Sequence, residues 1–136
     1  MRRLMSLFAA TLAAMPLTLQ AADNVYPSRP VRMIVPYPPG GGSDITGRAI
    51  GAKLGEYLGQ TFVIDNRPGA TGLIGTLLAA RAPADGYTIA FAYWGTHSIN
   101  RHLYKEMTFE EKDFTPVIFL ASVPQVLVVN SNSPFK

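Results

Sequence analysis

Cysteine is absent from the 136 residues, which excludes disulfide bonds and thiolate metal ligands. Only two histidines are present, His97 and His102, and residues five apart do not share one face of a helix as paired metal ligands do. Charged residues make up only 15% of the chain, and no basic stripe with interleaved aromatic residues occurs. We therefore expect no nucleic-acid partner, no metal and no organic cofactor.

Motifs for catalysis are missing as well. No Gly-x-Ser-x-Gly nucleophile elbow occurs, Gly40-x-Gly42 lacks the third glycine of a dinucleotide fingerprint, and no Gly-Lys-Ser/Thr completes a phosphate loop. Asp44 and Asp65 are a possible carboxylate pair, but their positions are better suited to capping a helix and ending a strand. We expect a protein that is not an enzyme, the alternative being a small secreted enzyme acting on an anionic substrate.

The start of the chain predicts export. Arg2 and Arg3 precede a mainly apolar run over 4–19, and Gln-Ala-Ala at 20–22 offers small residues for cleavage. This order is typical of a secretory signal peptide, 1–22, because the run is short for a membrane span and contains a proline. Without the two arginines, the twelve basic residues fall to ten against nine acidic ones, so the mature chain is nearly neutral.

Short apolar segments alternate with helical patterns along the mature chain. Strands are predicted at 31–35, 61–65 and 87–92, helices at 44–58 and 72–82, and a short helix at 100–106. Strand–helix repetition at this spacing predicts an α/β fold with a parallel sheet flanked by helices. Two further apolar runs follow, 117–121 and 126–129, and Pro124 lies between them.

Each predicted helix has an apolar side that we expect to be buried. The residues on these sides are Ile45, Ala49, Ile50, Leu54, Tyr57 and Leu58 in the first helix, and Leu73, Ile74, Leu77 and Leu78 in the second. Glycine also recurs at every fourth position of the first helix, at Gly47, Gly51, Gly55 and Gly59. The last is placed to end the helix. The other three form either a ridge packed close to a neighbouring backbone or a chance feature of composition.

Each predicted strand leads into a loop of glycine and small polar residues, at 37–44, 66–75 and 93–100. In parallel α/β sheets the carboxyl ends of the strands lie at one edge, where ligands bind. The first loop precedes a helix N-terminus, where unpaired amides and a positive dipole favour a carboxylate or phosphate group. Ordinary turn chemistry accounts for the same glycines, so the residues alone leave both interpretations open.

Five segments, taken together, resemble one known family. They are Pro-Tyr-Pro-Pro-Gly-Gly-Gly-Ser-Asp (36–44), Asp-Asn-Arg-Pro-Gly-Ala-Thr-Gly-Leu-Ile-Gly (65–75), Thr-His-Ser-Ile-Asn-Arg-His-Leu-Tyr (96–104), Asp-Phe-Thr-Pro-Val (113–117) and Val-Pro-x-Val-Leu-Val-Val (123–129). The mature chain is similar throughout to the substrate-binding proteins of tripartite tricarboxylate transporters, the Bug-type receptors. It departs from them at Arg101, where proline is usual, and at Gly51 and Gly55, where alanine is common.

The resemblance implies a periplasmic binding protein of the type II-like class, in which two α/β lobes close on a small organic acid. The implied ligand is a di- or tricarboxylate, an amino acid or an aromatic acid, delivered to the membrane permease subunits of the transporter. We expect a periplasmic monomer. Family members are more than twice as long, so 23–136 would hold most of the first lobe, with the second lobe mostly missing. A truncated fragment that no longer binds is the alternative.

The resemblance also assigns candidate ligand contacts, largely through backbone amides and bridging waters of the three loops. They are Tyr37, Gly40, Gly41, Gly42, Ser43 and Asp44 in the first loop, Gly69, Ala70, Thr71 and Gly72 in the second, and Gly95, Thr96 and His97 in the third. None of them is expected to be catalytic or to bind a metal.

Overall fold

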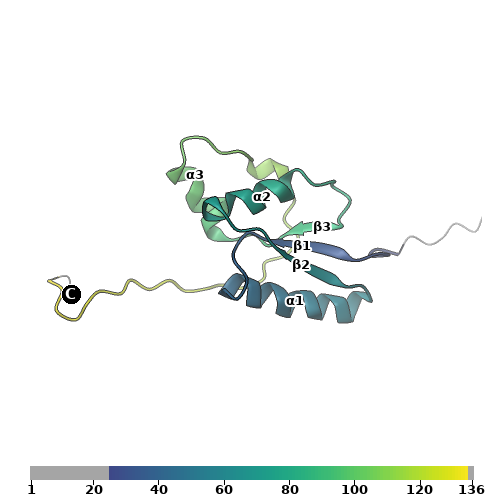
Figure 1. The fold of residues 1–136 in the computed structure, drawn as a ribbon, viewed down its shortest axis with the longest axis horizontal. Helices are drawn as coiled ribbons and strands as arrows, with labels where there is room; N and C mark the ends of the chain where they lie inside the picture. Colours follow the sequence, from purple (N-terminus) through teal and green to yellow (C-terminus); the bar gives the residue numbers. More distant parts are fainter. Residues whose placement is uncertain (1–24, 135–136) are drawn as a thin grey trace, which may run out of the picture.

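The computed structural model describes residues 25–134, and its centre is a three-stranded parallel sheet (Figure 1). The strands β1 (Val31–Val35), β2 (Phe62–Asn66) and β3 (Thr88–Ala90) lie in the order β2-β1-β3. The predicted α/β fold with a parallel sheet is therefore confirmed. The proposed signal peptide, 1–22, lies outside the described residues.

The middle strand, β1, forms the core of the sheet. Val31, Ile34 and Val35 are fully buried, as expected for a parallel strand covered on both faces. Pro36 then ends the strand, since it has no amide donor to continue the ladder. The bounds of β1 agree with the prediction, whereas β2 is shifted by one residue and β3 is shorter than expected.

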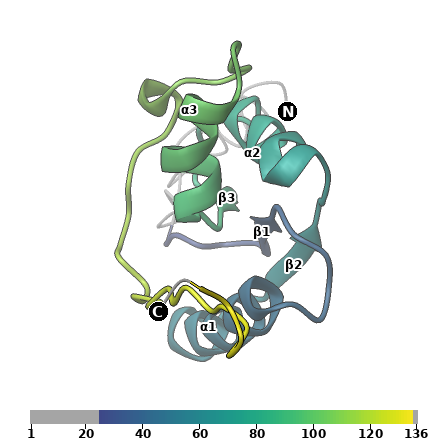
Figure 2. The same cartoon turned by 90° about the vertical axis from the view of Figure 1, so that its left-hand side faces the viewer.

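Helices cover both faces of this sheet. The long helix α1 (Gly42–Leu58) lies on one face, and α2 (Leu73–Ala80) lies on the other (Figure 2). A 3₁₀ turn, η1 (Ala70–Gly72), leads into α2. After β3, a π-helical turn, η2 (Gly95–Ile99), continues into α3 (Asn100–Leu103), and a last 3₁₀ turn, η3 (Glu111–Asp113), follows.

The face that α1 turns toward the sheet differs from the predicted one. Its buried residues are Asp44, Gly47 and Gly51. A Cβ atom added at Gly47 would lie 3.2 Å from Val35 Cγ2, and one at Gly51 would lie 3.1 Å from Ile64 Cδ1. Gly47 and Gly51 therefore form a closely packed ridge, which is favoured over chance composition, but their nearest neighbours are side chains and not the backbone that was predicted.

The large apolar residues of α1 lie beside this ridge or away from it. Of the six predicted to be buried, only Ile50 and Leu54 pack against the core. The prediction was wrong for the exposed side chains of Ile45, Ala49, Tyr57 and Leu58. Helical periodicity is read from large side chains, so a contact face made of glycine gives no hydrophobic signal.

The same correction applies to α2. Gly75 and Thr76 are its buried residues, Leu73 and Leu77 are half-buried, and Ile74 and Leu78 are exposed although they were predicted to be buried. A Cβ atom added at Gly75 would lie 2.6 Å from the carbonyl oxygen of Arg67. Small residues again set the contact, because they let the helix approach the backbone that follows β1 and β2.

Beyond residue 114 the chain runs extended and leaves the sheet (Figure 1). Both predicted apolar runs, 117–121 and 126–129, are exposed and form no strand in the described part of the chain, and Leu127 is 95% exposed. Between residues 25 and 134, no helix combines the length and apolar character needed to cross a bilayer.

Candidate functional site

The three loops meet at the carboxyl edge of the sheet, with Pro36 between them. A Cβ atom added at Gly72 would lie 3.4 Å from the carbonyl oxygen of Pro36 and 2.5 Å from Thr96 Cγ2. One added at Gly95 would lie 3.3 Å from the hydroxyl of Tyr37. These contacts place the start of the first loop, the end of the second and the beginning of the third side by side.

The first loop exposes the N-terminus of α1. Gly41 is the N-cap residue, no side chain caps the helix, and Ile45 N–H makes the first helical bond, to the Gly41 carbonyl at 3.0 Å. The prediction that Asp44 caps the helix was wrong, because Gly41 takes that position. The N–H groups of residues 42–44 have no acceptor among residues 25–134, so three donors remain at the positive end of a 17-residue helix.

Asp44 lies inside the first turn of α1 and is only 3% exposed. Its Oδ2 accepts hydrogen bonds from the N–H of Gly40 at 2.8 Å and from Arg48 Nε at 3.0 Å. The bond from Arg48, with that from Gly40, lowers the pKa of Asp44 to about 2. The carboxylate is therefore ionised at neutral pH, and its charge is balanced within the protein.

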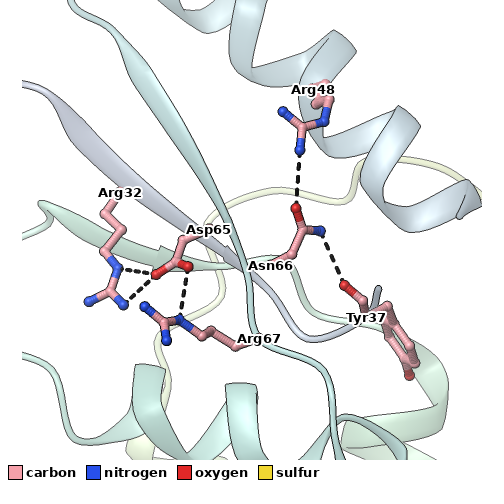
Figure 3. Close-up of polar contacts among 6 residues, drawn as sticks. All are labelled: Arg32, Tyr37, Arg48, Asp65, Asn66 and Arg67. Carbon is pink, nitrogen blue, oxygen red and sulfur yellow. Dashed lines mark hydrogen bonds and ion pairs between the residues drawn. The ribbon is translucent and has the colours of Figure 1, made fainter. Parts of the chain in front are cut away.

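Arg48 and Asn66 connect α1 to the first loop and were not identified from the sequence. Arg48 Nη2 donates to Asn66 Oδ1 at 3.1 Å, and Asn66 Nδ2 donates to the carbonyl of Tyr37 at 3.1 Å (Figure 3). The only sequence signal for this contact is that Asn66 ends β2, next to the strand that leads into the loop. Its partner on α1 depends on how the helix packs on the sheet.

Asp65 points the other way and pairs with two arginines (Figure 3). It accepts from Arg32 Nε at 2.7 Å and from Arg67 Nε at 2.8 Å. Burial alone would raise the pKa of Asp65, but hydrogen bonds from Arg32 and Arg67 outweigh it and lower the pKa. Asp44 and Asp65 therefore pair with separate arginines, and they do not form a pair for acid–base chemistry.

The second loop has an unusual backbone. Gly69, Ala70, Thr71 and Gly72 all have positive φ angles, of 131°, 45°, 52° and 91°. The left-handed region is unfavourable for Ala70 and Thr71, at about 1 kcal/mol or more each. Asn100 Nδ2 donates to the carbonyl of Thr71 at 3.1 Å, and Thr71 Oγ1 lies 2.8 Å from the hydroxyl of Tyr104. These contacts from α3 and the residue after it hold the strained loop in place.

In the third loop, the side chains of Thr96 and His97 already have partners among the neighbouring residues. Thr96 is fully buried, and its hydroxyl donates to the carbonyl of Tyr93 at 2.9 Å and lies 2.8 Å from His97 Nδ1. The imidazole of His97 packs 5.2 Å from the ring of Phe114, and burial lowers its pKa, which favours the neutral form. Whether either residue contacts a ligand stays a prediction.

An open hollow of about 580 Å³ lies beside the third loop. It is lined by His97, Arg101, Met107, Phe109 and residues 110–112. An ion pair of 2.7 Å joins Arg101 to Glu111 beside it. None of the first-loop or second-loop candidates lines this hollow, so it is separate from the point where the loops meet. Over residues 25–134, no group of three or more His, Cys, Asp or Glu is arranged to hold a metal ion.

Comparison with known proteins identifies the family. The family described as tripartite tricarboxylate transporter family receptor, TctC, matches residues 46–136. The chain belongs to this receptor family. The family resemblance predicted from the loop motifs is therefore confirmed.

Curated relatives of this TctC chain are considerably longer than it is. A Pseudomonas sp. protein from the tcbD-tcbE intergenic region is 39% identical over 136 residues, which cover 99% of this chain and 40% of the relative. BugT of Bordetella pertussis is 36% identical over 132 residues, which cover 96% of this chain and 40% of BugT. The chain thus spans about two fifths of the length of these relatives.

Solved structures share the fold of this TctC chain. MatC from Rhodopseudomonas palustris with bound malate has a TM-score of 0.67 and 35% identity, over 70% of this chain and 33% of MatC. A second R. palustris protein, solved with adipate, has a TM-score of 0.62 and 42% identity, over 64% of this chain and 29% of that chain. A structure described as a periplasmic transporter has a TM-score of 0.61 and 41% identity, over 62% and 29% of the two chains.

Proposed function

We propose that the protein is a periplasmic receptor that captures a small organic carboxylate and delivers it to the permease of a tripartite tricarboxylate-type transporter. The observation that carries this proposal is the set of three N–H donors at residues 42–44, which end the loop whose start contacts the loops after the other two strands. Membership of the receptor family and the malate and adipate bound to two structural relatives support a carboxylate as the ligand.

The proposed site recognises charge through the backbone. A carboxylate at the N-terminus of α1 would accept hydrogen bonds from the first-turn amides and gain from the helix dipole. The side chains nearby do not oppose it, because the carboxylate of Asp44 is paired with Arg48. In the second loop, the N–H groups of Ala70 and Thr71 also have no acceptor among residues 25–134, so they offer a second set of donors.

Within the candidate set, we propose that exposed backbone makes the ligand contacts and that buried side chains shape the loops. Residues 40–43 and 69–71 belong to the first group. The side chains of Asp44, Thr96 and His97 belong to the second, because each already has a partner inside the protein. Tyr37 is also held from within, by edge-on packing 5.4 Å from the ring of Tyr93.

The chain aligns with only 33% of the malate-bound relative, so most of that receptor lies outside the compared region. We propose that 23–136 provides one wall of the ligand site. A ligand enclosed from both sides makes contacts that one wall cannot supply, so affinity for this chain alone should be weak. Selectivity among acids would then depend mainly on the other wall.

The donor at Gly42 offers a direct test by isothermal titration with malate and adipate. Gly42 is the first helical residue, where proline is well tolerated, and a Cβ atom there meets nothing within 4 Å. Gly42→Pro therefore removes an N–H donor with little other change, while Gly42→Ala keeps it. We expect Gly42→Pro to weaken binding about tenfold, as for a hydrogen bond to a charged group worth about 1.5 kcal/mol.

Gly42→Ala and an uncharged ligand serve as controls for Gly42→Pro. Gly42→Ala should bind as the wild type does, and the uncharged adipamide should not bind any of the three proteins. The proposal would be overturned if the wild type bound neither acid, or if Gly42→Pro bound both acids with unchanged affinity.

A further inference from the structure

Arg48 links two contacts that hold the first loop, one at its start and one at its tip. Through Asp44 it reaches the N–H of Gly40, and through Asn66 it reaches the carbonyl of Tyr37. Figure 3 shows the branch from Arg48 through Asn66 to Tyr37. The two held backbone groups belong to one short turn, so a single guanidinium from α1 sets the position of both.

Little else holds the tip of this loop. Pro38 and Pro39 have no amide donors. Residues 38–42 are exposed, and Cβ atoms added at Gly40 and Gly42 would meet nothing within 4 Å. Because side-chain packing does not support the tip, its position depends on the polar contacts organised by Arg48.

Arg48 also balances the charge beside the free amides. The Asp44 carboxylate is 3% exposed and lies 3.0 Å from Arg48 Nε, in the same helical turn as the three unpaired donors. If Arg48 were neutral, a buried negative charge would remain next to the place where an anion is expected. With the pair intact, Asp44 can hold Gly40 without repelling the ligand.

We propose that Arg48 is a positioning residue for carboxylate binding, acting through Asp44 and Asn66 on the glycine loop. This inference rests on the proposed function, and it adds that a residue outside the loop controls its affinity. Two effects of removing Arg48 follow from the geometry: the loop tip loses its fixed position, and the charge of Asp44 becomes uncompensated. The effects are separable, because Asn66 carries only the first.

Titration of malate into a set of variants separates these two effects. Arg48→Gln should weaken binding by tenfold or more, and Asn66→Ala by a smaller factor. Adding Asp44→Asn to Arg48→Gln should restore part of the lost affinity, because it removes the uncompensated charge and keeps an oxygen that can accept from Gly40. Removing an uncompensated buried charge would also restore lost stability, so urea denaturation of each variant is needed to show that the rescue concerns affinity and not the folded fraction.

Arg29→Gln is the matched control. The side chain of Arg29 is 60% exposed and pairs with Asp85 at 2.9 Å, and the side chain of Arg48 is similarly exposed, at 54%, and paired. Arg29 differs in its position, because it precedes β1 and therefore lies away from the loops. Its replacement should leave malate affinity unchanged. Equal losses in Arg29→Gln and Arg48→Gln would overturn the proposal, since the effect would then be one of net charge.

A second measurement does not require a ligand. The Gly40 amide is protected by its bond to Asp44, so NMR should show faster hydrogen exchange at Gly40 in Arg48→Gln and unchanged exchange in Arg29→Gln. Unchanged exchange at Gly40 in Arg48→Gln would overturn the positioning role even if binding were lost. If the wild type bound no acid while Gly40 exchange still responded to Arg48→Gln, the proposed function would fail and the positioning of the loop by Arg48 would stand.

Discussion

The first and second loops lie side by side at the carboxyl edge of the sheet, and they are held in different ways. The first, residues 37–44, is exposed at its glycines and is tied by hydrogen bonds that converge on Arg48. The second, residues 66–75, includes a close contact at Gly72, which is buried against Thr96 and Pro36. The first loop depends on charge and polar contacts, whereas the second combines hydrogen bonds with Asn100 and Tyr104 and close packing at a position that lacks a side chain.

This difference indicates how the two loops divide the work of the proposed site. Close packing against backbone atoms leaves no room for movement, so the second loop is a rigid support. Polar contacts at a partly exposed surface adjust more easily, so the first loop can respond to a ligand, to pH and to salt. Substitutions should therefore affect stability most in the second loop and binding most in the first.

The largest effect on stability should come from Gly75→Ala, at the end of the second loop and within α2. The new methyl group would lie 2.6 Å from the carbonyl oxygen of Arg67 and 2.9 Å from Pro36 Cα, and neither backbone atom can move freely. We expect the free energy of unfolding to fall by about 3 kcal/mol, measured by urea denaturation. Gly42→Ala in open space should change it by less than about 0.5 kcal/mol. Equal losses in the two variants would remove the distinction between the loops.

A smaller loss should follow from Asn100→Ala. Asn100 is buried and donates to the carbonyl of Thr71, whose φ of 52° needs support from its surroundings. Loss of this bond should destabilise the protein by about 2 kcal/mol in the same assay. Asn130→Ala is a suitable control, because the side chain of Asn130 is exposed and accepts a local bond from the N–H of Asn132. A neutral effect of Asn100→Ala would show that packing alone holds the second loop.

The first loop should instead respond to acid. Folding lowers the pKa of Asp44 from 3.8 to about 2, so its ionised form stabilises the folded state fully above about pH 4. This contribution should fade as the pH falls toward 2. Urea denaturation should therefore show a difference between the wild type and Asp44→Asn that is largest at pH 5 and shrinks by pH 2. A difference that does not vary with pH would contradict this assignment.

The smallest effect on stability is expected far from both loops, in the extended segment. Leu127 is 95% exposed, so Leu127→Lys should change the free energy of unfolding by less than about 0.5 kcal/mol. The added charge should nevertheless reduce self-association, because the segment presents a run of exposed apolar residues. Sedimentation velocity of the wild type and of Leu127→Lys over a concentration series measures self-association. Equal self-association of the two proteins would show that this segment does not form the contact between molecules.

Sequence patterns predicted the elements better than their contacts. The bounds of β1 and the parallel sheet followed from a short apolar run stopped by proline and from the strand–helix spacing. The convergence of the loops also followed, because parallel strands end at one edge. The buried faces of α1 and α2 were predicted wrongly, because Gly47, Gly51 and Gly75 make contacts that hydrophobic periodicity does not register.

The order of residues along the chain was enough to determine a parallel α/β fold with glycine loops at one edge, because strand length, proline and glycine act locally on the backbone. Only the tertiary structure decided which side chains hold those loops. Arg48 and Asn66 are 18 residues apart, on a helix and at the end of a strand. Their contact exists because α1 packs on the sheet through glycines and β2 lies in register with β1, and neither relationship is visible in a local pattern.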